Sequence, residues 1–540
     1  MWSLRSLLWA AVLLTAIPVQ KLTAQAQQGP SGAPTFRVSS NLVFLDVTVL
    51  DKAGHPVVKG LTKDDFIITE DKKPQRIFSF EAPETHVMGA NAGDDNPDGR
   101  APVTIFVLDR LNSSFDDFAF FRYSVRKFLA AQPAQLNSPA ELMVVGNESL
   151  EMLQGYTRNK TDLLYALDHL PAALPYKEMQ GSFYWERVAQ SIDALQQIAL
   201  QNTGVPGRKN IVWVGRGGPA VNMQFLTGSV VGHLQHSVHT TTNMLVDARI
   251  SLFVIYPPLK VNPTLKVDDR SMLSGAMDAG ANIGDDDPFA GDINFGVFVN
   301  ETGGKLFYNR NDVDTEIKQS RRLGSDYYTL TYQPHDVAPD GKFRRIRVTL
   351  RNSNLRALTK AGYFAPDSNE PVDPQQQTMI KLAEAARSTI PLTALDMNLS
   401  DVVRHPDTRT AEVTVQLKGK NLDWQATDDG RSTANLILEE ASLTGDNNIL
   451  ASKTEKVTIF STVQDPTQRA EEVARLSLTI RIPRKTKSVR VVVETEEGGR
   501  IGAADLDRKT IDAAPAMPTP EPQLTSRGPE YVPPTTPQTH

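Results

Sequence analysis

The chain of 540 residues contains no cysteine. This absence excludes disulfide bonds, thiolate zinc sites, a cysteine nucleophile and a lipid-modified N-terminal cysteine. The formal net charge is only −6, so neither nucleic acid nor an anionic membrane is expected as the main partner. Beyond the N-terminus, no run approaches the roughly 18 apolar residues that a membrane-spanning helix needs, so no membrane span is predicted.

The familiar catalytic motifs are also missing. There is no G-x-S-x-G nucleophile elbow and no H-E-x-x-H metalloprotease motif. His233, His236 and His239 have helical spacing, but no carboxylate shares their register, so a helix face is favoured over a zinc site. Residues 215–218, GRGG, lack the GK[ST] ending of a phosphate loop. We therefore predict a protein that is not an enzyme.

The N-terminus has the pattern of a secretory signal. Arg5 precedes an apolar stretch over residues 7–17, and residues 24–26, Ala-Gln-Ala, form a small-x-small cleavage pattern. Residues 1–26 are predicted to be a signal peptide, which implies export to the periplasm, the envelope or the extracellular space. The alternative is an uncleaved N-terminal anchor.

A length of 540 residues suggests about three domains. Residues 43–49 alternate between apolar and polar, as a half-buried strand does, and short alternating runs separated by turn residues return after residue 390. The predicted organisation is a small β module at 36–82, a linker at 83–101, an α/β domain at 102–366, a linker with a short helix at 367–389, a β-sandwich at 390–512 and a disordered Pro-rich tail at 513–540.

The middle of the chain predicts a parallel sheet. Residues 103–108, 210–214 and 250–256 are short, almost wholly apolar runs rich in β-branched residues, typical of strands buried on both faces. Between them lie stretches with helical periodicity, of which residues 185–199 are the clearest. Strands that alternate with helices indicate a doubly wound, mostly parallel, Rossmann-like α/β fold.

A polar cluster, DRLNSS at residues 109–114, directly follows the first of these strands. Ligand sites of open α/β sheets lie outside the carboxyl ends of the strands, so this cluster is the best placed in the chain. It resembles the first metal-binding loop of the von Willebrand factor type A domain, Asp-x-Ser-x-Ser. Asp109 and Ser113 match that pattern, whereas Leu111 stands where the first serine belongs.

The resemblance extends to an ordered set of segments that begins with LTKDDFIITEDKKPQRIFSF and continues with KNIVWVGRGGP, ISLFVIYPP, ETGGKLFY, SDYYTLTYQP and KAGYFAP. In this order the segments resemble the von Willebrand A-related family described from acidobacteria, over about residues 36–366. The resemblance implies a type A-like fold. It does not imply a particular activity.

The same resemblance implies where a metal ion would bind. A complete type A site takes an Asp and two hydroxyls from loop one, a Thr from loop two and an Asp from loop three. The candidates in this chain are Asp109, Ser113 and Ser182, with Asn112 and Ser114 as further possibilities. Loop three carries Arg216 between glycines in place of an Asp. A weakly bound Mg²⁺, or no ion, is therefore predicted.

A purely structural role for Asp109 and Ser113 is the alternative, because Asp and Ser at a strand end often bond backbone N–H groups. We expect an exported, non-enzymatic binding or adhesion protein that recognises an extracytoplasmic protein partner through the loops at the C-terminal edge of its sheet. Two other functions stay open. One is a structural component of the envelope. The other is a hydrolase whose catalytic groups lie in the Gly- and Asp-rich segment 258–296.

Overall fold

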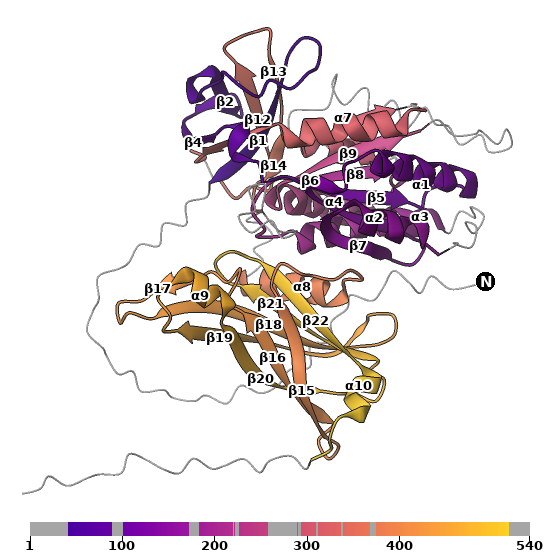
Figure 1. The fold of residues 1–540 in the computed structure, drawn as a ribbon, viewed down its shortest axis with the longest axis vertical. Coiled ribbons are helices and arrows are strands. Elements are labelled where there is room, and N and C mark those ends of the chain that lie inside the picture. Colours follow the sequence, from indigo (N-terminus) through magenta and orange to yellow (C-terminus); the bar gives the residue numbers. More distant parts are fainter. Residues whose placement is uncertain are drawn as a thin grey trace, which may run out of the picture. The chain divides into compact units, whose positions relative to one another are not determined.

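The computed structural model describes residues 42–88, 101–171, 183–219, 221, 226–257, 289, 293–308, 311–335, 338–367 and 374–517 (Figure 1). The predicted signal peptide, Ser182, most of the 258–296 segment and residues 518–540 lie outside these residues. Within them, no helix is both long and apolar enough to cross a membrane.

The centre of the α/β domain is a six-stranded sheet. Its strands are β5 (Val103–Asp109), β6 (Gln135–Val145), β7 (Leu150–Asn159), β8 (Lys209–Val214), β9 (Ile250–Tyr256) and β10 (Lys305–Tyr308). They lie in the order β10-β9-β8-β5-β6-β7. Neighbouring strands run parallel, except that β7 is antiparallel to β6. The prediction that the strands at 103, 210 and 250 are parallel neighbours is confirmed. Numbered along the chain, the order is 3-2-1-4-5-6, that of a doubly wound fold.

Helices cover both faces of this sheet, as the alternation of strands and helices predicted. They are α1 (Phe115–Ala130), α2 (Lys160–Asp168), α3 (Phe183–Gln201), α4 (Gly228–Asp247), α6 (Phe295–Glu301) and α7 (Val313–Ser325). Along β5, Ile105 and Val107 belong to one buried cluster with α3, α4 and α6, whereas Phe106 and Leu108 belong to another with α1, α2 and α7. Because successive side chains point to opposite faces, both faces of this central strand must be apolar.

The predicted small β module at 36–82 is not a separate unit. Its strands are β1 (Val43–Leu50), β2 (Phe66–Glu70), β3 (Lys73–Gln75) and β4 (Ile77–Glu81), accompanied by one-turn 3-10 helices at Lys63–Asp65 and Pro83–Thr85. They pair with four later strands, β11 (Tyr328–Tyr332), β12 (Phe343–Leu350), β13 (Arg356–Leu358) and β14 (Gly362–Phe364). The resulting sheets have the orders β13-β1-β11-β4 and β14-β12-β2-β3.

This pairing corrects two predictions. The α/β domain does not extend to residue 366, because residues 328–364 complete the β domain that residues 43–81 begin. The predicted hairpin is also shorter than expected, since β2 pairs with β3 whereas β4 joins the other sheet beside β11. Local patterning identifies strands, but it cannot show that their partners lie as far as 289 residues away, which is the separation of Val43 and Tyr332 in the β1–β11 register.

The C-terminal region begins with α8 (Pro374–Arg387), which is longer than the short helix expected there. It continues with β15 (Met397–His405), β16 (Thr410–Lys418), β17 (Gln425–Ala426), β18 (Ser432–Leu443), β19 (Ile449–Ser461), α9 (Pro466–Glu471), β20 (Val473–Arg481), β21 (Ser488–Thr495), β22 (Ile501–Asp507) and α10 (Arg508–Ala513). Antiparallel sheets β15-β16-β20 and β17-β18-β21-β22, with β19 on β18, share one buried apolar cluster. The face-to-face stacking of a β-sandwich stays a prediction.

Two other boundaries differ from those predicted. The tail does not begin at 513, because the backbone of Arg404 in β15 bonds the backbones of Pro515 and Met517. β15 is an edge strand, and an edge strand leaves N–H and C=O groups that another segment can satisfy. The segment 258–296 ends earlier than expected, since Ile293 forms a bridge to Val221 and α6 begins at Phe295.

Candidate functional site

The candidate site lies at the C-terminal edge of the six-stranded sheet, where β5 ends at Asp109 and β8 ends at Val214. The chain turns from β5 through residues 110–114 into α1, and Ser114 accepts a hydrogen bond from the N–H of Asp117 as the cap of that helix. Asp109 is fully buried. The polar cluster found in the sequence therefore starts from a carboxylate that has no contact with water.

The Asp109 carboxylate accepts hydrogen bonds from three other residues. Oδ1 receives the backbone N–H of Asn112 at 2.9 Å and its side-chain amide at 3.1 Å. Oδ2 receives the backbone N–H of Gly217 at 2.8 Å and the indole N–H of Trp213 at 3.2 Å. Both oxygens are therefore occupied by neutral N–H donors that belong to β8 and to the loops after β5 and β8.

Glycine allows the loop after β8 to approach Asp109 so closely. Gly215 has a φ of +143°, and a Cβ atom there would lie 2.3 Å from the Cβ of Asp109. Gly217 has a φ of +72°, and a Cβ atom there would lie 2.4 Å from the ring of Phe295. Neither position accepts another residue unless Asp109 or Phe295 shifts, and the φ of both glycines is one that other residues rarely adopt. Where the type A resemblance calls for a carboxylate, this loop supplies a backbone donor.

Helix α3 contributes a second layer to the site. The side-chain amide of Asn112 also donates to Ser191 Oγ at 3.1 Å, and Nε of Arg187 donates to Asn112 Oδ1 at 3.0 Å. Arg187 is itself buried. The side chain of Asn112 therefore links the positive charge of Arg187 to the carboxylate of Asp109. We call these contacts, together with the hydrogen bonds from Gly217 and Trp213, the Asp109 network.

Electrostatics decide what this site can do. Burial raises the pKa of Asp109 above its ordinary value, although the hydrogen bonds from Asn112, Trp213 and Gly217 act in the opposite direction. In the part of the chain that the structure describes, no group of three His, Cys, Asp or Glu side chains is arranged to hold a metal ion. The Asp109 network fixes the two loops and leaves the carboxylate no unoccupied oxygen directed at solvent.

The other predicted ligands do not converge on Asp109 as a metal site would require. The Ser113 hydroxyl donates to the backbone carbonyl of Asp109 at 2.5 Å, and the Ser114 hydroxyl donates to Asp117 of α1. Ser182 lies outside the described residues. The guanidinium of Arg216, expected beside the ion, lies over the ring of Tyr256 with its carbon 5.7 Å from the ring centroid. Asn112, a secondary candidate, is the one that contacts the carboxylate.

Sequence reasoning missed Arg187, Trp213 and the donor role of Gly217. One signal was present for Trp213, because an indole N–H inside a wholly apolar strand must find an acceptor. The glycines of residues 215–218 were a second signal, since glycine often marks a close approach of the backbone to another group. Nothing in the sequence indicated Arg187, because its contact depends on how α3 is placed over the loop.

The three histidines lie on α4, as their spacing predicted. His239 stacks on Phe364 with ring centroids 3.8 Å apart, and Nδ1 of His233 bonds the backbone carbonyl of Ser229. These contacts are those of histidines on a partly buried helix face.

The chain matches no family model and no curated protein sequence. Among solved structures it is similar to the VWA domain of SpRpn10, with 14% identity and a TM-score of 0.21, over 42% of this chain and 96% of that domain. It is also similar to IrmA from Escherichia coli, with 10% identity and a TM-score of 0.14, over 26% of this chain and 98% of that protein. Such weak likenesses carry no argument, and the strand order of the sheet is that of a doubly wound fold.

Proposed function

We propose that this chain is an exported, non-enzymatic binding or adhesion protein, and that it recognises a protein partner with the C-terminal edge of its type A-like sheet. The ordered motifs of residues 36–366 support a place in the type A-related family described from acidobacteria. The N-terminal signal pattern of residues 1–26 supports export.

The observation that carries the proposal is the set of exposed aromatic side chains around a rigid edge. Phe115, the first residue of α1, is 60% exposed; Trp185 at the start of α3 is 39% exposed; and Tyr308 at the end of β10 is 36% exposed. Given the direction of these elements, all three residues lie at the C-terminal edge of the sheet. Large aromatic residues supply much of the binding energy in protein interfaces.

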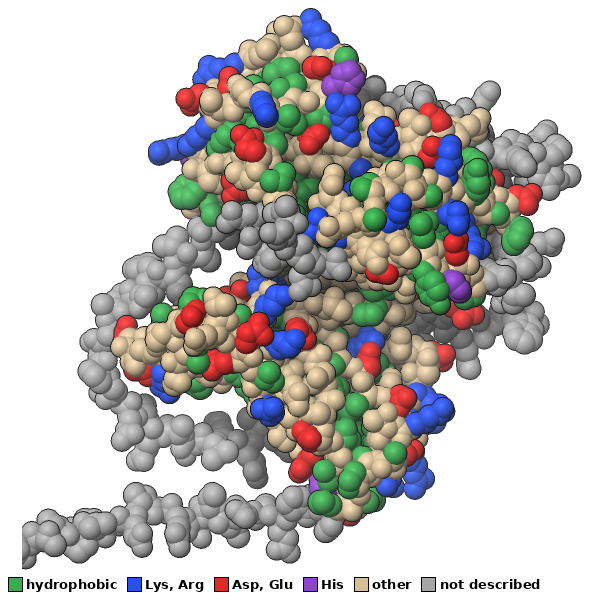
Figure 2. All heavy atoms as spheres, in the orientation of Figure 1, with side chains coloured by type: hydrophobic (Ala, Val, Ile, Leu, Met, Phe, Trp, Pro, Cys, Tyr) green, Lys and Arg blue, Asp and Glu red, His purple; other side chains and the backbone are tan. Residues whose placement is uncertain are grey.

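Rigidity of this edge favours recognition over catalysis. The Asp109 network holds the loops after β5 and β8 in place through buried N–H donors, so little ordering cost would accompany binding. A carboxylate whose oxygens are all engaged is poorly suited to accept a proton or attack a substrate. In the space-filling view, hydrophobic side chains stand among charged ones over α1 and α2, a mixture typical of transient interfaces (Figure 2).

A comparison of surface variants tests the proposal. The full chain is immobilised, extracytoplasmic proteins of the source organism are passed over it, and the retained proteins are quantified. We expect one protein retained in stoichiometric amount by the wild type and lost from the Phe115→Ser, Trp185→Ser double variant. The matched control is Phe78→Ser, which removes a 71% exposed aromatic from β4 in the β domain.

Retention of the partner is also measured after divalent ions have been chelated with EDTA. Because N–H donors hold the edge, we expect EDTA to leave retention of the partner unchanged. Equal retention by the double variant and the control, or recovery of wall material without a protein, would argue against the proposed function. Complete loss of retention in EDTA would show that the edge uses a metal ion after all.

A further inference from the structure

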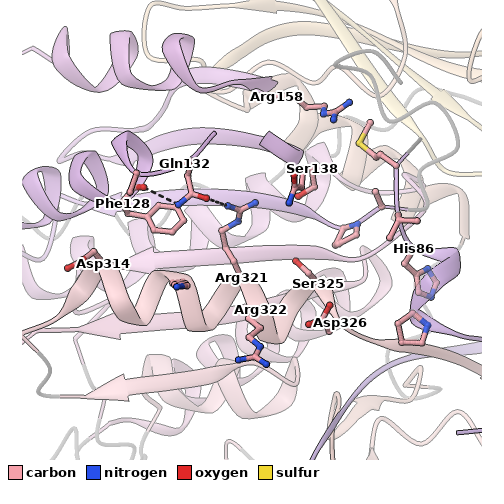
Figure 3. A pocket seen from close by; sticks show the side chains of 18 of the residues that line it. His86, Phe128, Gln132, Ser138, Arg158, Asp314, Arg321, Arg322, Ser325 and Asp326 are labelled. Carbon is pink, nitrogen blue, oxygen red and sulfur yellow. Dashed lines mark hydrogen bonds between the residues drawn. The ribbon is translucent and has the colours of Figure 1, made fainter. Parts of the chain in front are cut away.

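A cavity of about 900 Å³ lies at the opposite, N-terminal edge of the sheet. One wall comes from the segment after β4, with His86, and from the two residues before β5. The others come from the end of α1, the beginning of β6, the end of β7 and the length of α7 (Figure 3). Cavities of roughly 300–1,000 Å³ are those in which proteins hold small molecules. The cavity shares no residue with the Asp109 network, so what it binds is independent of the proposed function.

The lining of this cavity is strongly basic although the chain as a whole is acidic. The cationic lining residues are Lys127, Arg158, Lys318, Arg321 and Arg322. The only carboxylates among the lining residues are Asp314 and Asp326. Three of the cations stand at positions i, i+3 and i+4 of α7 and therefore share one helix face. The concentration of positive charge around one concave space would attract anions.

Arg321 is the group that points to a ligand. Its Nε is buried and has no hydrogen-bond partner in the structure. Nη1 makes only a long contact of 3.4 Å with Oε1 of Gln132, and the guanidinium lies 5.8 Å from the ring centroid of Phe128. Figure 3 shows the guanidinium directed into the cavity between Gln132 and Ser138. A charged group with a buried donor that has no partner is costly in free energy. Such a group calls for an explanation, and an anion in the cavity would complete its hydrogen bonds.

The surrounding groups do not neutralise Arg321. Asp314 already pairs with Lys127 at 3.0 Å. Burial raises the pKa of Asp326, and the nearby charge of Arg322 lowers it in part. Burial also lowers the pKa of Arg321, and no carboxylate counteracts this effect. Because the ordinary pKa of an arginine is so high, the side chain nevertheless stays charged.

Arg158 supports the same conclusion from the other wall. It is buried, and its Nε donates to the backbone carbonyl of Leu136 at 2.9 Å, which fixes the guanidinium beside the cavity. Ser138, also buried, and Asn137 bring a hydroxyl and an amide to the same wall. Cations on separate walls, with hydroxyl and amide donors between them, suit a ligand that carries more than one oxyanion group.

We propose that this cavity binds a small molecule bearing two or more oxyanion groups, phosphate or carboxylate, with Arg321 as its principal contact. Inorganic pyrophosphate and citrate represent the two sources of that chemistry. Binding of either to the full chain is measured by titration calorimetry at low ionic strength. We expect saturable binding of at least one probe with a dissociation constant below the millimolar range.

Two arginine variants separate site binding from general attraction. Arg321→Gln removes the charge inside the cavity, and we expect the dissociation constant of the bound probe to rise about tenfold or more, as for the loss of a charged hydrogen bond. Arg475→Gln removes an exposed arginine from β20 and is the matched control, which we expect to bind as the wild type does. Equal weakening in both variants would reduce the effect to net charge and overturn the proposal.

The melting temperature of Arg321→Gln shows whether its loss of binding comes from misfolding. If Arg321 serves a ligand, its replacement by Gln should leave the melting temperature of the free protein unchanged or higher, because an unpaired buried charge is removed. The same replacement should abolish the rise in melting temperature that the probe causes in the wild type. A large fall in the melting temperature of free Arg321→Gln would assign Arg321 a structural role. Failure of both probes to bind at millimolar concentration would also overturn the proposal.

Discussion

The two edges of the central sheet handle buried charge in opposite ways. At the C-terminal edge, Asp109 has both carboxylate oxygens occupied by N–H donors from its own loop, from β8 and from the loop that follows β8. At the N-terminal edge, Arg321 keeps a buried Nε with no partner, on the wall of a cavity lined by more cations than anions. The carboxylate of Asp109 thus has all its oxygens in hydrogen bonds, whereas the guanidinium of Arg321 keeps an unused donor.

A buried charge with all its hydrogen bonds made and one that lacks a partner have opposite effects on stability. A fully satisfied buried network stabilises one arrangement of the backbone, and a partly satisfied one lowers stability unless something else completes it. Although the sequence around Asp109 resembles a metal-binding loop, the hydrogen bonds of Asp109 are those of a residue that holds two loops together. The cavity that we propose as a small-molecule site lies at the N-terminal edge, which the resemblance does not indicate.

The largest expected effect is that of removing the carboxylate of Asp109. Asp109→Ala leaves the N–H groups of Asn112, Trp213 and Gly217 buried without an acceptor, and each such group costs about 1–3 kcal/mol. We expect the free energy of unfolding to fall by about 3–5 kcal/mol, measured by urea denaturation.

Two variants control this measurement. Asp109→Asn keeps one oxygen as an acceptor, so its loss of stability should be smaller than that of Asp109→Ala. Asp116→Ala, an exposed carboxylate in the first turn of α1, should change stability by less than about 1 kcal/mol. If Asp109→Ala were as stable as Asp116→Ala, the contrast between the two edges would be wrong.

Much of the fold could be predicted from the sequence, because its signals are local. The apolar runs at β5, β8 and β9 and the periodicity of α3 identify a doubly wound sheet. The antiparallel edge strand β7 was missed, since its residues are mostly half-buried and show no clean alternation. The β domain was divided wrongly because residues 43–81 and 328–364 find each other only through long-range pairing.

Only the part of the candidate site that lies within the single loop after β5 could be predicted from the sequence. Asp109, Asn112 and Ser113 are close in sequence, so their proximity in space follows from the turn after β5. Arg187 and Gly217 come from other elements, and their contacts depend on the packing of α3 and the loop after β8. The basic cavity was missed for the same reason, although the cations of α7 at helical spacing were a usable signal.

A second buried carboxylate sharpens the comparison because it lacks the donors that Asp109 has. Glu141 of β6 is fully buried; Oε2 accepts from the Gln201 amide at 3.2 Å, and Oε1 is without a partner. Burial raises the pKa of Glu141 to about 8, and the nearby polar groups of Gln201 and Tyr156 lower it only in part. Between pH 4.5, the ordinary value, and about 8, the folded chain holds this proton and the unfolded chain has released it. The free energy of unfolding therefore falls as pH rises through this window.

Glu141→Gln removes this pH dependence without changing the shape of the side chain. We expect the variant to exceed the wild type in unfolding free energy by about 4 kcal/mol at pH 8, since each tenfold difference in proton affinity between the folded and unfolded chains corresponds to roughly 1.4 kcal/mol. The excess should shrink toward pH 5, where the wild-type carboxyl is protonated in the folded state. Urea denaturation at the two pH values measures it, and stability curves that stay parallel would contradict the assignment.

The smallest expected effect is that of magnesium. For Mg²⁺ to bind Asp109, it would have to displace N–H donors that are 2.8–3.2 Å from the carboxylate oxygens. It would also approach the buried cation of Arg187, which is joined to the carboxylate through Asn112, and it would find the Ser113 hydroxyl directed at a backbone carbonyl. Millimolar Mg²⁺ should therefore raise the free energy of unfolding by less than about 0.5 kcal/mol, as expected for a dissociation constant no tighter than the ion concentration. Differential scanning calorimetry of the full chain in Mg²⁺ and in EDTA decides this. A rise of several degrees in the melting temperature with Mg²⁺, absent in Asp109→Asn, would show that the ion displaces the donors and that the closed edge opens to a metal.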